Sequence, residues 1–289
     1  MIYGDRNTGV IVQGATGKQG AYHLALMNEY ARKIGGRGAI AGVTPGKGGT
    51  EVHGVPVYNS VREARDEQPE AKAQIIFVPA GAAADSIMEG AHAGMDLVVV
   101  ITENIPVHDT MRAIAYARTM GTVVVGPNCP GLLSPGELKL GIMPSQLFLR
   151  GSVGVISRSG TLTYEVVDEL SRAGIGQSTV VGIGGDPVIG ETFVDAIGRF
   201  EKDPETDAVV LIGEVGGNLE EEGASACSLP LVAYIAGKSA PPEKRMGHAG
   251  AIIEGGEGDA SFKIQRLRDL GIPVAEKPSD IPRIIRDLR

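Results

Sequence analysis

Hydrophobic residues gather in short unbroken runs along nearly the whole chain, separated by longer amphipathic segments. Runs of Val, Ile, Leu and Ala without polar alternation indicate strands that are buried on both faces of a parallel sheet. The intervening segments have the spacing of helices. In the first half we expect strands at 10–13, 39–43, 74–78, 97–101 and 122–125, and helices at about 21–33, 82–93 and 108–120.

The second half repeats this rhythm after a Pro- and Gly-rich stretch, 126–151, that has no regular periodicity. We expect strands at 153–157, 179–183, 207–212, 229–236 and near 273–274, and helices at about 162–173, 191–202, 260–270 and 281–288. Alternating strands and helices predict an α/β fold with parallel sheets. We place a domain boundary at the start of the irregular stretch, which gives domains at 1–126 and 127–289.

Composition narrows the class of protein. Hydrophobic residues make up 43% and charged residues 21% of the chain, as in a soluble globular protein. A net charge of −8 disfavours nucleic acid or an anionic membrane as the main partner. Two cysteines are too few for a disulfide framework, the start is too polar for a signal peptide, and no apolar run approaches the ~18 residues that span a bilayer. We therefore expect a cytoplasmic protein.

Glycines at 14, 17 and 20 lie between the first predicted strand and the first predicted helix. Backbone N–H groups in such a turn, together with the helix dipole, suit a phosphate group. The spacing is G-x-x-G-x-x-G and differs from the usual dinucleotide pattern, so a tight turn that binds nothing is the alternative interpretation.

The end of the next strand, 39–43, favours a particular kind of ligand. An NAD site usually has an acidic residue there for the ribose hydroxyls, whereas this chain has Lys47 in a glycine-rich loop. A ribose that carries an extra phosphate is therefore favoured, as in NADP or coenzyme A. The loop is not a Walker A motif, because Ala41 and Gly48 stand where that motif needs Gly and Ser or Thr.

Three stretches of the second half end on polar residues that share one predicted sheet edge. Ser159-Gly160-Thr161 precedes a helix, which fits either an anion site or a simple N-cap. Glu214 follows a strand, and His248 lies in a glycine-flanked loop that leaves another strand. A histidine beside an anion site, with a carboxylate to hold its second ring nitrogen, is equipped to carry a phosphoryl group.

Several long motifs together resemble the α subunits of succinyl-CoA synthetase, the succinate–CoA ligase of the citric acid cycle. The resemblance runs from near Val10 to the final predicted helix and rests on the stretches 42–49, 126–131, 157–165, 184–187 and 247–250. It implies a Rossmann-like CoA-binding domain followed by a flavodoxin-like α/β ligase domain that carries a phosphohistidine loop.

The resemblance also implies roles for individual residues. Coenzyme A would be bound by Thr16, Gly17, Lys18, Gln19, Lys47, Ile101, Thr102 and Glu103. His248 would be phosphorylated with Glu214 as its partner, Ser159, Gly160 and Thr161 would bind the phosphate, and Tyr164 would lie near the acid substrate. No metal ligand is expected in this chain.

A second chain follows from the same resemblance. A β subunit with an ATP-grasp fold would bind Mg²⁺ and ATP or GTP, in an αβ or α2β2 assembly. The nucleotide would phosphorylate His248, succinate would take the phosphoryl group, and the CoA thiol would attack succinyl phosphate and release phosphate. The absence of a P-loop from this sequence agrees with a nucleotide site on another chain.

The sequence departs from the family pattern at two places, and it leaves three alternative functions open. The segment 217–230 is shorter than expected and contains Gly223, which predicts a truncated or irregular helix, and Asn104 stands where glycine is usual. The alternatives are a related acid–CoA ligase such as a malate–CoA ligase subunit, an NADP-dependent oxidoreductase, and a non-catalytic CoA-binding protein.

Overall fold

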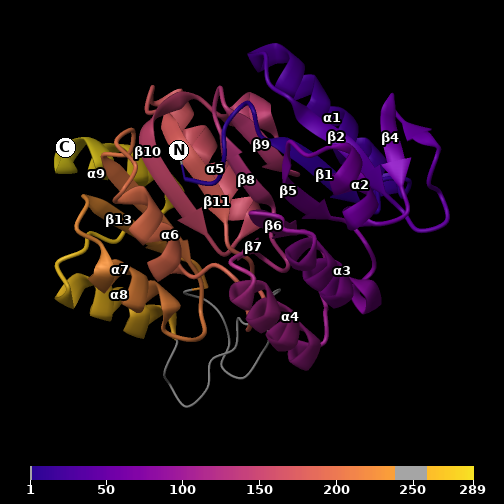
Figure 1. Cartoon of the computed structure of the whole chain (residues 1–289). Helices are drawn as coiled ribbons and strands as arrows, with labels where there is room; N and C mark the ends of the chain where they lie inside the picture. Colours follow the sequence, from indigo (N-terminus) through magenta and orange to yellow (C-terminus); the bar gives the residue numbers. More distant parts are fainter. Residues whose placement is uncertain (1, 238–258) are drawn as a thin grey trace. The chain divides into compact units, whose positions relative to one another are not determined.

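The structure is a computed structural model that describes residues 2–237 and 259–289, and the chain forms two compact units (Figure 1). The first comprises Tyr3–Met143 together with Val188–Gly190. The second comprises Ile2, Pro144–Pro187 and the described part of Glu191–Arg289. The boundary that the sequence predicted after Gly126 lies inside the first unit.

A seven-stranded sheet with the order β3-β4-β2-β1-β5-β6-β7 forms the centre of the first unit. Its strands are β1 (Gly9–Gln13), β2 (Gly38–Val43), β3 (Glu51–Val52), β4 (Val55–Tyr58), β5 (Ala71–Ile76), β6 (Leu97–Val100) and β7 (Val123–Val125). The ladders are parallel except for β3 with β4. Without β3, the strands taken in chain order give 3-2-1-4-5-6, which is the order of a Rossmann fold.

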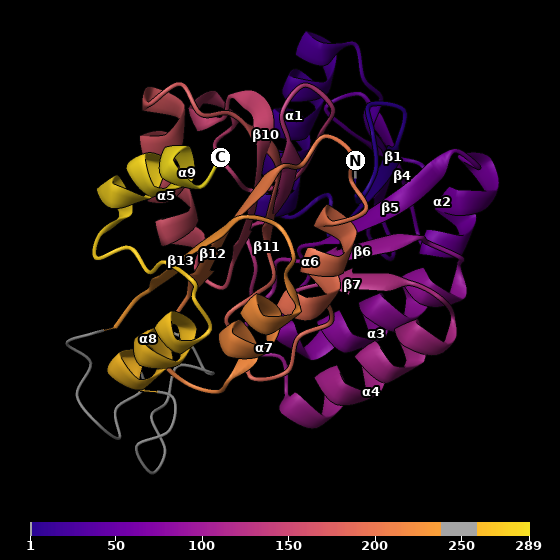
Figure 2. The same cartoon turned by 90° about the vertical axis from the view of Figure 1, so that its left-hand side faces the viewer.

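Small and branched apolar residues explain why the helices can lie close to this sheet. The helices are α1 (Lys18–Ile34), α2 (Val61–Glu67), α3 (Ala80–His92) and α4 (Val107–Thr119). Ala83, Ile87 and Ala91 of α3 pack in one core with Ala113 and Ala117 of α4, where α3 and α4 lie side by side (Figure 2). That core also contains strand residues such as Ile11 and Val98.

The stretch 126–151, for which we expected no regular structure, contains a hairpin in the first unit. Strands β8 (Gly131–Ser134) and β9 (Leu138–Gly141) pair antiparallel, and β9 packs on α1. A Cβ at Gly131 would lie 2.2 Å from the backbone oxygen of Leu140, so this close pairing requires glycine. The hairpin escaped prediction because each strand is only four residues long and is buried throughout, including Lys139 of β9.

The second unit contains four parallel strands in the order β13-β12-β10-β11. They are β10 (Arg150–Ser157), β11 (Gln177–Gly182), β12 (Ala208–Gly213) and β13 (Leu231–Ile235). Taken in chain order this is 2-1-3-4, the flavodoxin-like order. The predicted fold class, Rossmann-like followed by flavodoxin-like, is confirmed.

Helices pack against both faces of these strands. The helices are α5 (Gly160–Arg172), α6 (Phe193–Phe200), α7 (Leu219–Ala226), α8 (Ala260–Asp269) and α9 (Ile281–Leu288), with short 3₁₀ turns at Ser145–Leu147 and Pro278–Asp280. α5 packs with α9, whereas α6 packs with α7 and α7 with α8 (Figure 2). The expected strand near 273–274 is a single bridge between Ala233 and Val274.

The shortened segment 217–230 folds as a regular helix of eight residues, α7, and the following strand begins at Leu231. Gly223 lies where α7 meets α6, because a Cβ at this position would stand 2.5 Å from Cβ of Phe193. The glycine that weakened the helix prediction is therefore the residue that lets the two helices approach.

Replacing Gly223 by Ala should lower the free energy of unfolding by about 1–3 kcal/mol, because the added methyl overpacks the contact with Phe193. Gly198→Ala in α6 is the matched control, since a Cβ there meets nothing within 4 Å. The control should raise the stability by roughly 0.5–1 kcal/mol through helix propensity. Urea unfolding followed by circular dichroism measures both, and equal midpoints for the two variants would contradict this account of the α6–α7 contact.

Candidate functional site

In the first unit, the order of the strands reverses between β1 and β5, and ligands of such sheets bind beyond the carboxyl ends at this switch point. Hydrogen bonds connect the strand ends there. Gly14 N donates to Val43 O at 2.8 Å and Phe77 N donates to Gln13 O at 2.9 Å. These bonds fix the turns after β1, β2 and β5 relative to one another, so that the loops form one edge.

The glycine turn after β1 is shaped by two close backbone contacts. Gly14 has φ +83°, and a Cβ at Gly20 would lie 2.2 Å from Gly14 O. Gly17 is the N-cap of α1, no side chain caps this helix end, and its first turn contains no acidic residue. The first N–H groups of a helix have no acceptor within it, so this exposed turn presents donors and a positive dipole end to an anion.

Lys47 lies in a loop that two neighbouring side chains hold in shape. Asn59 Oδ1 accepts from Gly46 N at 2.9 Å and from Gly48 N at 3.0 Å. Thr44 Oγ1 lies 3.2 Å from Oγ1 of Thr16, which joins this loop to the glycine turn. The sequence-predicted residues Thr16, Gly17, Lys18, Gln19 and Lys47 are all exposed.

The third predicted part of the CoA site follows β6. Thr102 Oγ1 donates to Val78 O at 2.6 Å, which joins the carboxyl end of β6 to that of β5. Ile101 and Thr102 are half-buried, whereas Glu103 is exposed. Asn104 has φ +61°, a conformation that favours glycine and that asparagine tolerates better than most residues. The departure at Asn104 therefore keeps the backbone that a glycine would adopt.

In the second unit, the order of the strands reverses between β10 and β12. Ser159 follows β10 as the N-cap of α5, and its Oγ accepts from Leu162 N at 3.4 Å. Ser159 therefore caps α5, as one of the two interpretations predicted. The cap uses only this side chain, so Gly160 and the exposed Thr161 still lie at the positive end of the helix dipole. Tyr164 lies in α5, four residues after Gly160 and hence on the same face of the helix.

Glu214 directly follows β12, the strand that pairs with β10, and is buried. Arg158, the residue after β10, places its Nε 3.6 Å from Glu214 Oε1 and is 3% exposed. The structure therefore brings the Glu214 turn to the carboxyl edge that also carries Ser159 and Gly160. His248 lies outside the described residues, and its predicted role stays a prediction.

Three buried charged residues at this edge have no role in the sequence prediction. They are Arg158, Glu220 and Lys263. A signal for Lys263 was present, because it shares the helical spacing of Ala260, Ile264 and Leu267 and so falls on the apolar face of α8. A lysine on such a face indicates a buried ionic partner.

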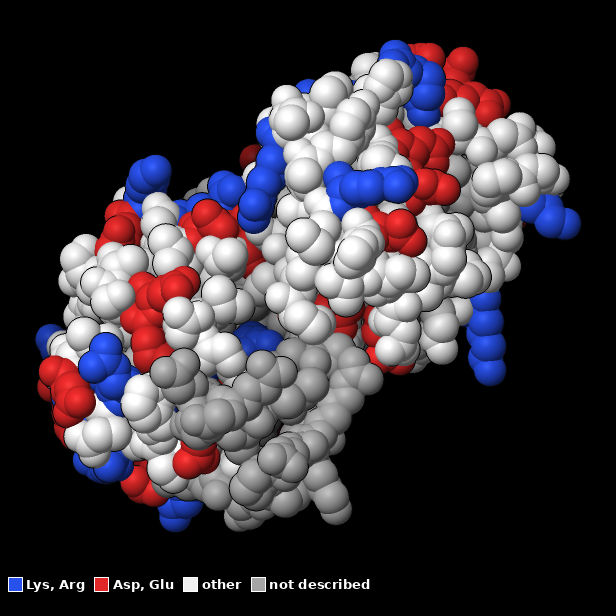
Figure 3. Space-filling model, turned by 90° about the horizontal axis from the view of Figure 1, so that it is seen from below, with Lys and Arg blue, Asp and Glu red and all other residues white. Residues whose placement is uncertain are grey.

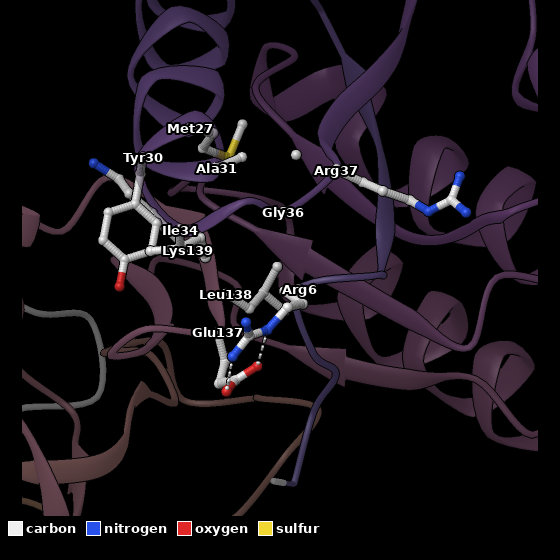
Figure 4. Close-up of a pocket in the computed structure, with 11 residues that line it drawn as sticks. Arg6, Met27, Tyr30, Ala31, Ile34, Gly36, Arg37, Glu137, Leu138 and Lys139 are labelled. Carbon is white, nitrogen blue, oxygen red and sulfur yellow. Dashed lines mark hydrogen bonds and ion pairs between the residues drawn. The ribbon is translucent and has the colours of Figure 1, made fainter.

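A pocket elsewhere in the first unit does not compete with these edges as a ligand site. It lies beside the C-terminal end of α1, away from the glycine turn, and includes Arg6, Tyr30 and Lys139 (Figure 4). Its cavity holds about 10 Å³, roughly the space of one water molecule. Arg6 bonds Glu137 through Nε at 3.1 Å and Nη2 at 2.7 Å, and burial lowers the pKa of the Lys139 amine.

Three further observations concern the described residues as a whole. On the described part of the face in Figure 3, acidic and basic side chains are interspersed. Within residues 2–237 and 259–289, no cluster of three or more His, Cys, Asp or Glu residues suits a metal ion. No helix in these ranges is long and apolar enough to cross a membrane.

Comparison with protein families places both units. A family model described as CoA binding domain matches residues 5–104, and one described as CoA-ligase matches residues 156–272. The chain is 56% identical to the succinate–CoA ligase [ADP-forming] subunit alpha of Methanothermobacter thermautotrophicus, over 99% of this chain and 96% of that protein. The corresponding subunit of Staphylococcus epidermidis is 51% identical over 99% of this chain and 94% of that protein.

Solved structures extend the comparison. ATP citrate lyase from Methanothrix soehngenii, in complex with citrate and coenzyme A, matches 99% of this chain with a TM-score of 0.89 and 26% identity. This chain spans 50% of the length of that lyase. A dinucleotide-forming acetyl-coenzyme A synthetase of Ca. Korarchaeum cryptofilum matches 94% of this chain and 59% of its own length, with a TM-score of 0.75 and 23% identity, and shows the shared fold.

Replacing Asn59 by Ala should free the Lys47 loop, because Gly46 N and Gly48 N lose their common acceptor. We expect amide hydrogen exchange at both glycines to accelerate about tenfold, because a factor of this size corresponds to the net free energy of roughly one hydrogen bond. Asn28→Ala is the matched control: Asn28 bonds the backbone of Ala39, so exchange should change at Ala39 and not in the loop. Unchanged exchange at Gly46 and Gly48 in Asn59→Ala would contradict the geometry.

Proposed function

This chain belongs to the family of succinate–CoA ligase α subunits, and from this premise we propose that its two units bind coenzyme A and carry the phosphoryl group of one reaction. The reaction is the reversible conversion of a nucleoside triphosphate, succinate and CoA to the diphosphate, phosphate and succinyl-CoA, a step of the citric acid cycle. The observation that carries the proposal is the presence in one chain of two switch-point edges, one built around a lysine loop and one around a buried carboxylate.

Coenzyme A fits the edge of the first unit on the chemistry of the residues there. The N–H groups of Lys18 and Gln19, at the exposed start of α1, suit the pyrophosphate, and no acid in the first turn of α1 opposes it. Lys47 provides a cation where the ribose of a dinucleotide would otherwise meet a carboxylate. The remaining contacts in this proposal come from Thr16, Gln19, Ile101, Thr102 and Glu103.

The second edge supports phosphoryl transfer. In this proposal His248 accepts the γ-phosphoryl group on a ring nitrogen, and the nucleoside diphosphate leaves. The α5 end at Ser159, Gly160 and Thr161 stabilises the phosphate. The Glu214 carboxylate accepts a hydrogen bond from the other ring nitrogen, which fixes the tautomer and supports the developing charge.

Two further displacements complete the reaction. A carboxylate oxygen of succinate, bound near Tyr164, attacks phosphorus and displaces the imidazole, which forms succinyl phosphate. The CoA thiolate attacks the acyl carbon, the phosphate oxygen leaves, and the thioester remains. The covalent stage divides one difficult condensation into displacements with good leaving groups, and each is reversible.

The proposal requires a β subunit, which would supply Mg²⁺ and ATP or GTP, because the sequence contains no P-loop. The assembly is αβ or α2β2, which sedimentation of the reconstituted complex distinguishes. We place the complex in the cytoplasm without nucleic acid or membrane as partners. The net charge of −8 and the fact that Cys129 and Cys227 form no disulfide support this placement.

Lys47→Ala should weaken CoA binding about tenfold, because one charge-assisted contact to the ribose phosphate is lost. The same variant should bind 3′-dephospho-CoA as the parent protein does. Lys72→Ala serves as the matched control, because Lys72 is exposed at the opposite end of the sheet, in the second position of β5. Isothermal calorimetry provides the affinities, and an equal loss for both ligands would contradict the assignment of Lys47.

Incubation of the complex with γ-labelled ATP or GTP should give an acid-labile, base-stable phosphate on this chain that succinate plus CoA discharges. His248→Asn should abolish the label, since Asn offers no ring nitrogen. His108→Asn, at an exposed position of α4, is the matched control and should keep it. Label that persists in His248→Asn would refute the phosphohistidine, and unchanged ligase activity in that variant would favour a non-catalytic CoA-binding protein.

A further inference from the structure

A buried ionic cluster lies beneath the turn that carries Glu214 in the second unit. Lys263 and Glu220 are both 0% exposed, and Lys263 Nζ lies 2.6 Å from Glu220 Oε2. α8 contributes the lysine and α7 the glutamate, and the two helices pack together. The pair thus joins two helices to the carboxyl edge of β12.

Lys263 holds the turn through its backbone. Its ammonium donates to Gly216 O at 3.0 Å, to Gly217 O at 2.9 Å and to Glu220, which accounts for the three N–H groups of a lysine. Gly216 and Gly217 have φ +94° and +62°, so two successive residues adopt the left-handed region. The buried ammonium of Lys263 therefore helps to fix the direction in which the chain leaves Glu214.

Glu220 holds the other side of the same turn. Its Oε1 accepts from Glu214 N at 3.2 Å and lies 3.5 Å from Arg158 Nη1. Arg158 Nη1 also donates to Gly216 O at 3.3 Å, and its Nε lies 3.6 Å from Glu214 Oε1. A Cβ at Gly213 would lie 2.3 Å from Glu220 Cγ, so the end of β12 is shaped to admit the Glu220 side chain.

Stability alone does not account for this arrangement. Removing two charges from water costs more than their attraction commonly returns, and well-packed apolar residues of similar volume are often at least as stable. The ionic pair instead fixes the path of the backbone, because its two side chains hydrogen-bond to backbone groups of residues 214–217. The position of the Glu214 carboxylate depends on this path of the backbone.

We propose that Lys263 and Glu220 are positioning residues for phosphoryl transfer, which act by fixing the Glu214 turn and, through Arg158, the Glu214 carboxylate. The inference rests on the proposed function, in which Glu214 orients the phosphorylated imidazole. It assigns to α8 a part in the reaction without contact with substrate.

The test is a double-mutant cycle on the reconstituted complex. Lys263→Met should lower kcat and the rate of phosphoenzyme formation by about tenfold to a hundredfold, as small misplacements of reacting groups do. The KM for CoA should stay unchanged, because the CoA edge belongs to the other unit. In a Glu214→Gln background, Lys263→Met should cause no further loss of rate, since the lysine acts through Glu214.

Two companion variants separate positioning from folding. Lys263→Met combined with Glu220→Gln removes both charges, so a folded chain with a slow phosphoryl step is expected. Arg268→Met, on the same helix in an exposed pair with Glu276, is the matched control and should keep the parent rate. Thermal unfolding of every variant reports the structural effect independently of the rate.

The outcomes are distinct. If the parent complex forms no phosphoenzyme, the proposed function fails, and this inference fails with it. If the parent complex is labelled but the losses from Lys263→Met and Glu214→Gln are additive, or Lys263→Met changes melting temperature without changing rate, the positioning role alone is overturned.

Discussion

Close approach of other atoms to the backbone at the carboxyl ends of the strands is the constraint on which both units depend. A Cβ at Gly20 would lie 2.2 Å from Gly14 O, and one at Gly213 would lie 2.3 Å from Glu220 Cγ. At these points the chain leaves a buried strand and turns toward the next helix. Glycine at the turns permits that passage and leaves helix N–H groups and side chains at one edge of each sheet.

The two edges have the same construction and different chemistry. At the first, Asn59 and Thr44 hold an exposed lysine loop against an uncapped helix end, which suits a highly charged ligand. At the second, buried charges fix the turn of a carboxylate. The first edge suits an anionic substrate that binds and leaves, and the second suits a residue that carries a phosphoryl group covalently. The two units of the chain therefore correspond to two parts of the proposed reaction.

The sequence predicted most of the fold, because unbroken Val, Ile and Ala runs and helical spacing are local signals. The helix at 281–288 matches α9 to the residue, and the fold class is correct. The hairpin β8–β9 depends on the close approach of Gly131 to the Leu140 backbone, and α7 packs Gly223 against Phe193 of α6. Periodicity records neither contact. For the site, the sequence located the turns, but it could not show that Glu220 and Lys263 meet, because their partnership joins two helices far apart along the chain.

The central claim is that the first unit binds coenzyme A through a Rossmann-like edge that lacks the acid of a dinucleotide site. Calorimetric titration of this protein with CoA and with NADPH tests it most directly, because both ligands carry a pyrophosphate and a phosphorylated ribose. The account predicts saturable binding of CoA and no comparable binding of NADPH. Tight binding of NADPH without binding of CoA would contradict it and would favour an NADP-dependent oxidoreductase.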